Sequence, residues 1–589
     1  MKKLLLKSFF VLTAFSGLIT PQTNAQNSWE FKDAASGTDT WSNTFRFSPP
    51  VQKSNSVVYT TTIGNNPRLM TTNAGIDAGA ADFSEATTVK ARRLMAITMR
   101  IGAGGPDYFR VIHPKTGGGD FYLNYPTQLS INDGKFHTYY VDLASNTAMQ
   151  AEWGGIKNSF TILFKAWSGS AGAGHNYNNA GATIEVDRIE FVNNVFKGTA
   201  SSNGEPTGKT GNNGNWVFSK PSTDGTEDVL FPSGTPESPL VNSVLNVKSI
   251  SLGAGVTLAH DAGSNVTVVD DMVFGIGSSY VPHTNSTVNI GEALRKVEVK
   301  DNNWHLISSP VDTEEYDDAW VTANGIESGT GNNRGVSTYD NGTLDGSTGP
   351  WRYYQAGAAA TTFGDGVGYA LKATDATGDI YEFTGTYQAG TISPAITQDV
   401  TNYNLVGNPY NAYIDVAAFI TENTTKLPAS AESIYVWDAV NSTYKSLTSG
   451  YLQPGQGFFV DSDVASDVVD FTPAMQGHDS VATFYRSSET SIKLAVTNGK
   501  STRAAAINYM EGKTSSLDPR FDIALFTGVP SDLSVYTHLL ENNDGIAFER
   551  QALPNTDLAS MVIPVGVKAE ANKEITFSAE AMNLPTGIK

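Results

Sequence analysis

Hydrophobic and polar residues alternate along several short stretches near the start of the chain. In the clearest of these, residues 94–101, 136–143 and 182–191, apolar side chains recur at every second position. This alternation is typical of β-strands with one buried face, and clusters of Gly, Asn and Asp separate the stretches. The pattern predicts a two-sheet jelly roll over residues 27–194.

The pattern changes in the next part of the chain. Short apolar triplets separated by Gly-rich turns predict a short β-solenoid-like segment over residues 215–291. The triplets are residues 250–252, 256–258, 266–268 and 288–290. Residues 198–214 are rich in Gly, Asn, Thr and Ser, and this composition predicts a flexible linker.

Residues 292–485 contain an internal duplication. Three elements recur in the same order: residues 304–310 with 403–409, 339–340 with 437–438, and 366–371 with 455–460. A duplicated β unit keeps its core order while its loops vary in length. We therefore expect both copies to have the same strand order, with Pro310 equivalent to Pro409 and Leu306 to Leu405.

Residues 489–589 again contain strand-like stretches, at 521–526 and 561–567. The phrase at 575–578 starts another strand, so we expect a β-sandwich that this sequence does not complete. The plainest helical candidate in the whole chain is short, at residues 416–421. The overall prediction is an all-β protein with several domains.

The first residues have the layout of a secretory signal peptide. Three lysines precede an apolar stretch at residues 8–19, and a polar segment then ends at Ala25. We expect residues 1–25 to be removed after Ala25 and the protein to be extracellular or on the outer cell surface. No later stretch approaches the roughly 20 apolar residues that span a bilayer, so no membrane insertion is expected.

Two global properties narrow the function. The chain has no cysteine, which excludes disulfides, thiolate nucleophiles and a lipid on an N-terminal cysteine. Its formal net charge is −20, and such a chain repels phosphate backbones and anionic lipid surfaces. Nucleic acid is therefore not an expected partner.

Several short motifs in the first domain resemble those of galactose-binding-like jelly rolls. They are residues 29–31, 66–69, 95–101, 133–139, 153–155 and 184–189. Such modules are common in polysaccharide-handling surface proteins of Bacteroidetes, so the resemblance implies a polysaccharide or another glycan as partner. Related jelly rolls often bind a structural calcium ion, for which Asp142 and Asp187 are candidates, but their spacing forms no loop motif and no metal ligand is assigned.

The duplicated region resembles a second family. The phrases at 404–409 and 455–460 are similar to a repeat of long secreted Bacteroidetes proteins. In those proteins a C-terminal sorting domain of the type IX secretion system follows. The resemblance implies that this chain lacks such a domain and that export machinery is a partner through it.

No catalytic constellation is present in the sequence. The eight histidines are scattered singly, and neither a Gly-x-Ser-x-Gly elbow nor a phosphate-binding loop occurs. Glu185 and Asp187 lie on one side of a predicted strand, where we interpret them as a solvated or hydrogen-bonded face. We therefore assign no catalytic residue and no cofactor and expect a protein that is not an enzyme.

Aromatic and polar residues together indicate a sugar site. Sugar rings stack on Trp and Tyr, while their hydroxyls need amide or charged partners. In residues 120–125, Tyr122 and Asn124 alternate with core-type residues, and the Gly-rich loop 166–181 contains Trp167 and Tyr177. These four residues are the predicted glycan contacts, with Arg110 as a further polar candidate. By contrast, the tryptophans in recurring structural phrases are predicted core or turn anchors: Trp153, Trp304, Trp351 and Trp437.

Three functions remain open at this stage. The first is a non-catalytic surface protein that binds glycans or mediates adhesion. The second is a secreted polysaccharide-active enzyme, or an accessory fragment of one. The third is a structural stalk on the cell surface.

Overall fold

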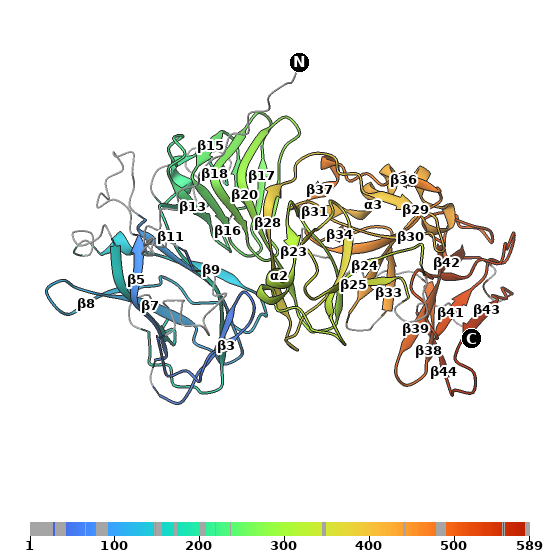
Figure 1. Ribbon diagram of the computed structural model, residues 1–589, viewed down its shortest axis with the longest axis horizontal. Coiled ribbons are helices and arrows are strands. Elements are labelled where there is room, and N and C mark those ends of the chain that lie inside the picture. The colour runs from blue at the N-terminus through green and yellow to red at the C-terminus, as the bar shows by residue number, and fades with distance from the viewer. Residues whose placement is uncertain are drawn as a thin grey trace, which may run out of the picture.

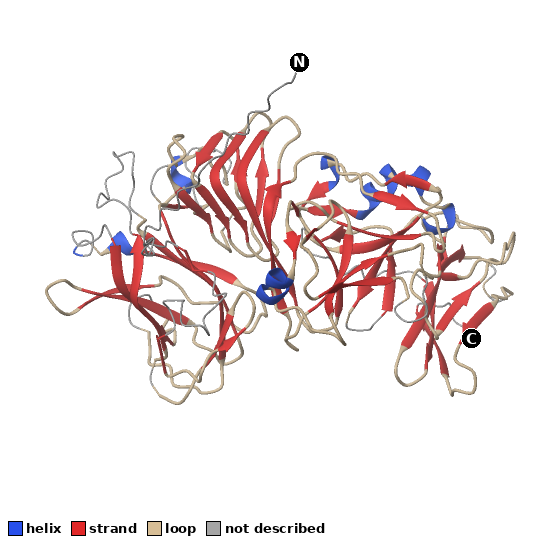
Figure 2. Ribbon diagram, viewed as in Figure 1, coloured by secondary structure: helices blue, strands red, loops and turns tan. Residues whose placement is uncertain are grey.

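A computed structural model describes residues 28–582, except 30–42, 65, 78–91, 147, 149–155, 170–173, 199–207, 218–219, 236, 344–348, 440–442, 479–489, 557 and 559. The predicted signal peptide and Trp153 lie outside the described residues. Strands dominate and the helices are short (Figure 2), which confirms the predicted all-β class. Figure 1 shows the parts of the chain following one another from the blue N-terminal sandwich to the red C-terminal sheet.

The N-terminal part is a sandwich of two antiparallel sheets. The first sheet has the order β3-β4-β11-β6-β9, with β1 beside β11, and the second has the order β2-β5-β10-β7-β8. The first comprises β1 (Ser28–Trp29), β3 (Val51–Gln52), β4 (Val57–Thr60), β6 (Leu94–Ile101), β9 (His137–Asp142) and β11 (Thr183–Val192). The second comprises β2 (Asn43–Phe45), β5 (Arg68–Asp77), β7 (Tyr108–Pro114), β8 (Asp120–Asn124) and β10 (Ile156–Lys165).

The core of the sandwich lies between these sheets and follows the predicted alternation. Met95, Ile97 and Met99 of β6 face Phe109 and Val111 of β7 in one apolar cluster. The intervening residues of each strand point outward, so each sheet presents a second face away from this core. The two outer faces differ in whether another part of the chain covers them.

A parallel β-solenoid follows. Its strands stack coil upon coil in the order β12-β13-β16-β18-β20, and a second face has the order β14-β17-β19. They are β12 (Asn194–Val195), β13 (Asp228–Phe231), β14 (Leu240–Val241), β15 (Val244–Val247), β16 (Ser249–Leu252), β17 (Thr257–His260), β18 (Asn265–Phe274), β19 (Ser279–Val281) and β20 (Thr287–Val299). The solenoid is longer at both ends than the predicted segment 215–291.

Residues 198–214 are predicted to be a flexible linker. For residues 208–214, which the structure describes, this prediction is wrong. Lys209 bridges to Leu240, and the Trp216 indole Nε1 donates a 2.8 Å hydrogen bond to the Thr210 carbonyl. Trp216 is fully buried against Phe196 and Phe231. The polar composition suggested flexibility, but these residues form the first coil and close the end of the solenoid core.

The duplicated region has two copies of one sheet, with orders β21-β27-β24-β25 and β30-β35-β32-β33. The first copy consists of β21 (Trp304–Ser308), β24 (Asn333–Tyr339), β25 (Trp351–Gln355) and β27 (Gly368–Lys372). The second consists of β30 (Tyr403–Gly407), β32 (Ile434–Asp438), β33 (Thr443–Leu447) and β35 (Gly457–Asp461). The strand order predicted from the repeated motifs is therefore confirmed, and Leu306 and Leu405 lie in equivalent strands.

Each copy also inserts a short helix after its first strand. The helices α2 (Asp318–Ala323) and α3 (Val416–Glu422) are capped by Asp317 and Asp415, whose carboxylates accept amide hydrogen bonds of the first turn. The helix predicted at 416–421 is thus present.

The two copies contact each other reciprocally. The Ser308 amide donates to the Gly455 carbonyl, and the equivalent Gly407 amide donates to the Gly366 carbonyl, both at 2.9 Å. A Cβ atom on Gly407 would lie 2.4 Å from the Ser308 Cβ, so this close approach requires glycine. The repeated Gly-containing phrases therefore mark the contact between the copies.

Short strands complete this region. They are β22 (Val311–Asp312), β23 (Glu315–Tyr316), β26 (Thr361–Thr362), β28 (Asp379–Tyr387), β29 (Ala395–Thr397), β31 (Tyr413–Asp415), β34 (Tyr451–Leu452), β36 (Ser466–Val468) and β37 (Gln476–Gly477). Strand β28 pairs antiparallel with β20, so the solenoid sheet continues into the duplicated region without a break.

The C-terminal part forms a seven-stranded sheet in the order β43-β41-β42-β39-β38-β44, with β40 beside β42. Its strands are β38 (Thr490–Thr497), β39 (Thr502–Met510), β40 (Ile523–Ala524), β41 (Ser534–Thr537), β42 (Phe548–Pro554), β43 (Val565–Lys568) and β44 (Thr576–Met582). The strand predicted at 575–578 begins β44. Among the described residues, no helix is long and apolar enough to cross a membrane.

Candidate functional site

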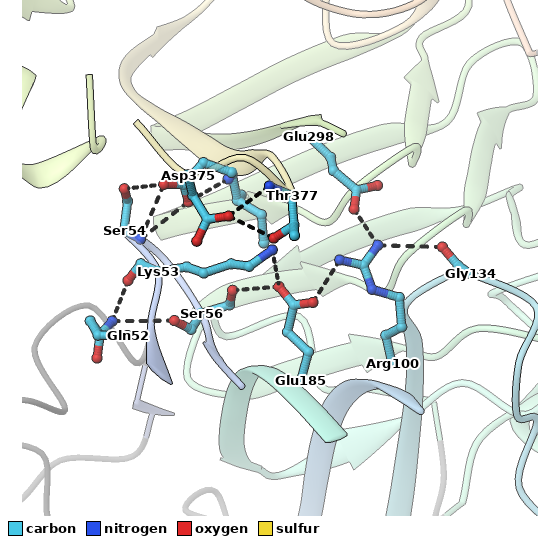
Figure 3. A network of polar contacts seen from close by, with 12 residues as sticks. Gln52, Lys53, Ser54, Ser56, Arg100, Gly134, Glu185, Glu298, Asp375 and Thr377 are labelled. Carbon is cyan, nitrogen blue, oxygen red and sulfur yellow. Dashed lines mark hydrogen bonds and ion pairs between the residues drawn. The ribbon is translucent and has the colours of Figure 1, made fainter. Parts of the chain in front are cut away.

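The outer face of the first sandwich sheet is covered by the solenoid. Glu185 on β11 accepts hydrogen bonds from Arg100 Nη2 and Ser56 Oγ, both at 2.7 Å, and Arg100 also pairs with Glu298 of β20 (Figure 3). The Lys53 ammonium lies 3.5 Å from the Glu185 carboxylate. Charged groups from the sandwich and the solenoid therefore neutralise one another within the interface.

A second ion pair lies deeper in the same interface. Lys296 Nζ lies 2.6 Å from Asp187 Oδ1, and both side chains are almost fully buried. Burial raises the pKa of the Asp187 carboxyl, and the Lys296 ammonium opposes that rise. Of the two alternatives expected for Glu185 and Asp187, the hydrogen-bonded face is confirmed, and it is not solvated because another part of the chain buries it.

Both calcium candidates are also engaged in ion pairs. Asp142 is paired with Arg93 at 3.1 Å, and Asp187 is paired with Lys296. Among the described residues, no group of three acidic or histidine side chains could hold a metal ion.

The outer face of the second sheet brings three of the predicted site residues together. Arg110 on β7 is paired with Asn124 on β8, and its Nε donates a 2.6 Å hydrogen bond to Asn124 Oδ1. The Arg110 guanidinium lies 5.3 Å from the centre of the Tyr122 ring, which is 51% exposed. The predicted alternation of residues 120–125 is confirmed, because Phe121 and Leu123 lie in the core.

Two cationic residues that the sequence did not single out lie on this face. Strand register places Arg68 of β5 and Arg110 of β7 on either side of Leu163. Lys165, two residues further along β10, has its pKa lowered by burial and by the positive charge of Arg110. Only the pairing of β5, β10 and β7 brings these cations together, and no motif in the sequence encodes that pairing.

Trp167 lies at the end of the same face. Its ring packs on Tyr108 with ring centres 5.4 Å apart, and its amide donates a 2.7 Å hydrogen bond to Asp107. Tyr108 is fully buried while Trp167 is half-buried, so the indole covers the tyrosine and keeps part of its own surface accessible.

Tyr177, one of the predicted glycan contacts, does not have an exposed ring. Tyr177 is only 4% exposed, and its hydroxyl donates a 2.8 Å hydrogen bond to the Gly104 carbonyl. Its amide also donates to Asn66 Oδ1 at 3.0 Å. A Gly-rich loop needs an anchor, and Tyr177 fastens this loop to the sandwich and does not offer a ring face to a ligand.

Three of the tryptophans predicted as anchors lie in the duplicated region. All three are partly buried. Trp304, Trp351 and Trp437 all pack against one aromatic cluster between the duplicated region and the C-terminal sheet. They contribute to packing as predicted, but they also line a cavity.

Comparisons with known proteins give one family model and several solved structures. The model matched is a domain of unknown function (DUF8693), over residues 201–449. No curated protein matches the chain.

Several carbohydrate-binding modules are among the similar solved structures. A family 29 module is 10% identical over 25% of this chain and 74% of its own, with a TM-score of 0.16. The family 11 module of the Clostridium thermocellum cellulase Lic26A-Cel5E is 10% identical over 29% of this chain and 90% of its own, with a TM-score of 0.16. A tandem family 22 module of Paenibacillus barcinonensis Xyn10C is 14% identical over 62% of this chain and 91% of its own, with a TM-score of 0.17. TM-scores this low carry no argument for function.

Proposed function

We propose that the protein binds glycans, without cleaving them, through the outer face of the β2-β5-β10-β7-β8 sheet. One observation supports this most directly. The other sandwich sheet is sealed against the solenoid, whereas this sheet presents the exposed Tyr122 ring beside the Arg110–Asn124 pair. An aromatic face beside amide and guanidinium groups suits the apolar faces and the hydroxyls of sugars.

The charge of the face favours an acidic glycan. Arg68, Arg110 and Lys165 lie on neighbouring strands in a chain whose formal net charge is −20. Guanidinium groups bind carboxylates and sulfates through paired hydrogen bonds. A polysaccharide of uronic acids or sulfated sugars would bring negative charge to these cations and stack a ring on Tyr122 at the same time.

Affinity electrophoresis of the full chain in gels containing polygalacturonate, alginate, chondroitin sulfate, xylan or galactan tests the proposal. We expect the acidic polysaccharides to retard the protein most, with retardation falling as salt is added. Loss of binding when Arg110 is replaced by Gln, with an unchanged melting curve, would support this face as the site. Equal migration in every gel, or cleavage of any polysaccharide, would contradict a non-catalytic glycan-binding protein.

We also propose that the protein acts outside the cell. The layout of residues 1–25 supports export, and the acidic, cysteine-free composition suits a surface protein. N-terminal sequencing of the protein secreted by its own cells should begin at Gln26. A protein retained inside the cell with its first residues intact would contradict this.

A further inference from the structure

A cavity of about 330 Å³ lies where the duplicated region meets the C-terminal sheet. Its wall on one side comes from β21 and β25, with Trp304, Trp351 and Tyr353. Trp437 and Tyr444 line it from the second copy, and Glu549 of β42 lines it from the C-terminal sheet. The site is separate from the sandwich face described above.

One aromatic side chain, Phe526, fills part of the junction and lines the cavity. Phe526, from the loop after β40, packs on Tyr444 and Tyr403 with ring centres 4.1 and 4.6 Å away. The same loop is fixed by Tyr339, whose hydroxyl donates to the Gly528 carbonyl. Beyond this plug, the three tryptophans are not fully covered by protein and remain partly buried.

The walls provide flat apolar faces in two directions. Trp304 lies 5.8 Å from Tyr353 in the first copy, and Trp437 lies 4.7 Å from Tyr444 in the second, measured between ring centres. Pairs of aromatic rings presented by two different sheets can contact a flat ligand from more than one side.

Polar groups are set among these rings. The Trp437 indole Nε1 is buried and has no hydrogen-bond partner in the part of the chain that the structure describes. Burial raises the pKa of the Glu549 carboxyl to about 7, against a hydrogen bond from Ser446 and the charge of Arg550. Arg503 also lines the cavity. A purely apolar ligand would offer these groups no hydrogen bonds, and leaving buried polar groups unpaired is costly.

Size and chemistry together define the ligand. A cavity of about 150 Å³ holds one benzene ring, so this one has room for roughly two six-membered rings. We propose that the cavity binds the end of a carbohydrate chain, one or two sugar rings long. The rings would stack on the indoles, and their hydroxyls would accept from Trp437 Nε1 and bond to Glu549 and Arg503. This site does not depend on the glycan-binding face of the sandwich.

Tryptophan fluorescence of the full chain tests the proposal directly. The background protein carries Trp167→Phe and Tyr122→Ala, which removes the fluorescent group and the aromatic contact of the sandwich face. It is titrated with glucose, galactose, N-acetylglucosamine, cellobiose and N,N′-diacetylchitobiose. We expect at least one of these sugars to give a saturable change in fluorescence.

Two variants show whether the change comes from the cavity. Trp437→Phe keeps a flat ring but removes the N–H donor, so the affinity should fall roughly five-fold. Ala504 is exposed and lines the cavity, and Ala504→Phe should fill it and abolish the change with little effect on the melting temperature. If Trp437→Phe unfolds the protein, the response of Ala504→Phe alone shows whether the fluorescence change comes from the cavity.

Several results would overturn the proposal. No fluorescence change with any of the sugars at concentrations on the order of 10 mM would do so, because even weak sites fill there. An unaltered response in Ala504→Phe would place binding elsewhere. A response to toluene together with none to the sugars would show that the cavity is an apolar site. Polysaccharide retention by the sandwich face is measured separately, so either proposal can fail alone.

Discussion

The chain joins its parts through two junctions of opposite character. The sandwich meets the solenoid through buried opposite charges, with Lys296 and Asp187 at the centre. The duplicated region meets the C-terminal sheet through aromatic rings grouped around Phe526. The ion pairs bring the sandwich and the solenoid into direct contact, whereas the rings around Phe526 surround a cavity. A polar junction fixes the position of two parts, while an aromatic one can fix their position and also retain a binding surface.

The charged junction should be the more sensitive to a single change. Lys296→Ala leaves the Asp187 carboxylate buried without its cation, so the free energy of unfolding should fall by about 3–5 kcal/mol. Thermal unfolding followed by circular dichroism measures the loss. The double variant Lys296→Met with Asp187→Leu should recover most of it, because both charges are then absent. Equal instability in the double variant would show that packing, and not charge, holds this junction.

At the aromatic junction the matching change is Phe526→Ala. Removing the ring enlarges an existing cavity, and we expect a loss of about 3 kcal/mol, at the lower end for a buried phenylalanine. Urea unfolding measures it. Phe526→Leu is the control, since it keeps most of the apolar volume and should restore much of the stability. A loss below that of an ordinary surface substitution would contradict the role of Phe526 as the plug.

The aromatic junction should also make stability depend on pH. Burial raises the pKa of Glu549 to about 7, and that of Asp461 in β35 also to about 7. A carboxyl with a raised pKa in the folded state stabilises the fold while it is protonated, and this contribution is lost as pH rises from about 4.5 through 7. The melting temperature of the C-terminal half should therefore fall over this range, and Glu549→Gln should flatten the fall. A fall of the same steepness in Glu549→Gln would contradict the assignment.

The smallest effect on stability should come from the exposed sheet, which belongs to neither junction. Tyr122→Ala removes a ring that is 51% exposed, so the melting temperature should hardly change. Stacking on an exposed ring contributes on the order of 1 kcal/mol, so retention by acidic polysaccharides should weaken about five-fold. Phe121→Ala, one residue away in the core, is the matched control and should destabilise the sandwich instead.

The sequence was sufficient to predict most of the architecture but not the surroundings of the outward-facing residues. Alternation placed Phe121 and Leu123 in the core, and repeated phrases predicted the strand order of both copies, because these signals are local. Alternation at Glu185 and Asp187 is the same whether a strand faces water or another domain, so the interface was missed. Tyr177 was misjudged for a related reason, since glycines around an aromatic do not reveal which distant carbonyl its hydroxyl reaches.

The candidate site shows the same limit. Tyr122, Asn124 and Arg110 could be selected by residue type and alternation alone. Arg68 and Lys165 could not, because they join the site only through the pairing of β5 and β10 with β7. The tryptophans of the duplicated region were correctly placed in packing, but the cavity beside them depends on how far the Phe526 loop reaches.

The reciprocal contact between the two copies has a further meaning. Ile307 bridges to Gln456, and its counterpart Val406 bridges to Val367, the counterpart of Gln456. Each copy thus gives the other the same contact that it receives, which is the signature of an isologous two-fold interface. Here that interface lies within one polypeptide. The two copies are therefore arranged like the subunits of a symmetric dimer, although they belong to a single chain. Dilution cannot separate its halves, and each half has acquired contacts of its own: β28, next to the first copy, pairs with solenoid strand β20, while Tyr435 of the second copy donates to the Ala524 carbonyl of the C-terminal sheet.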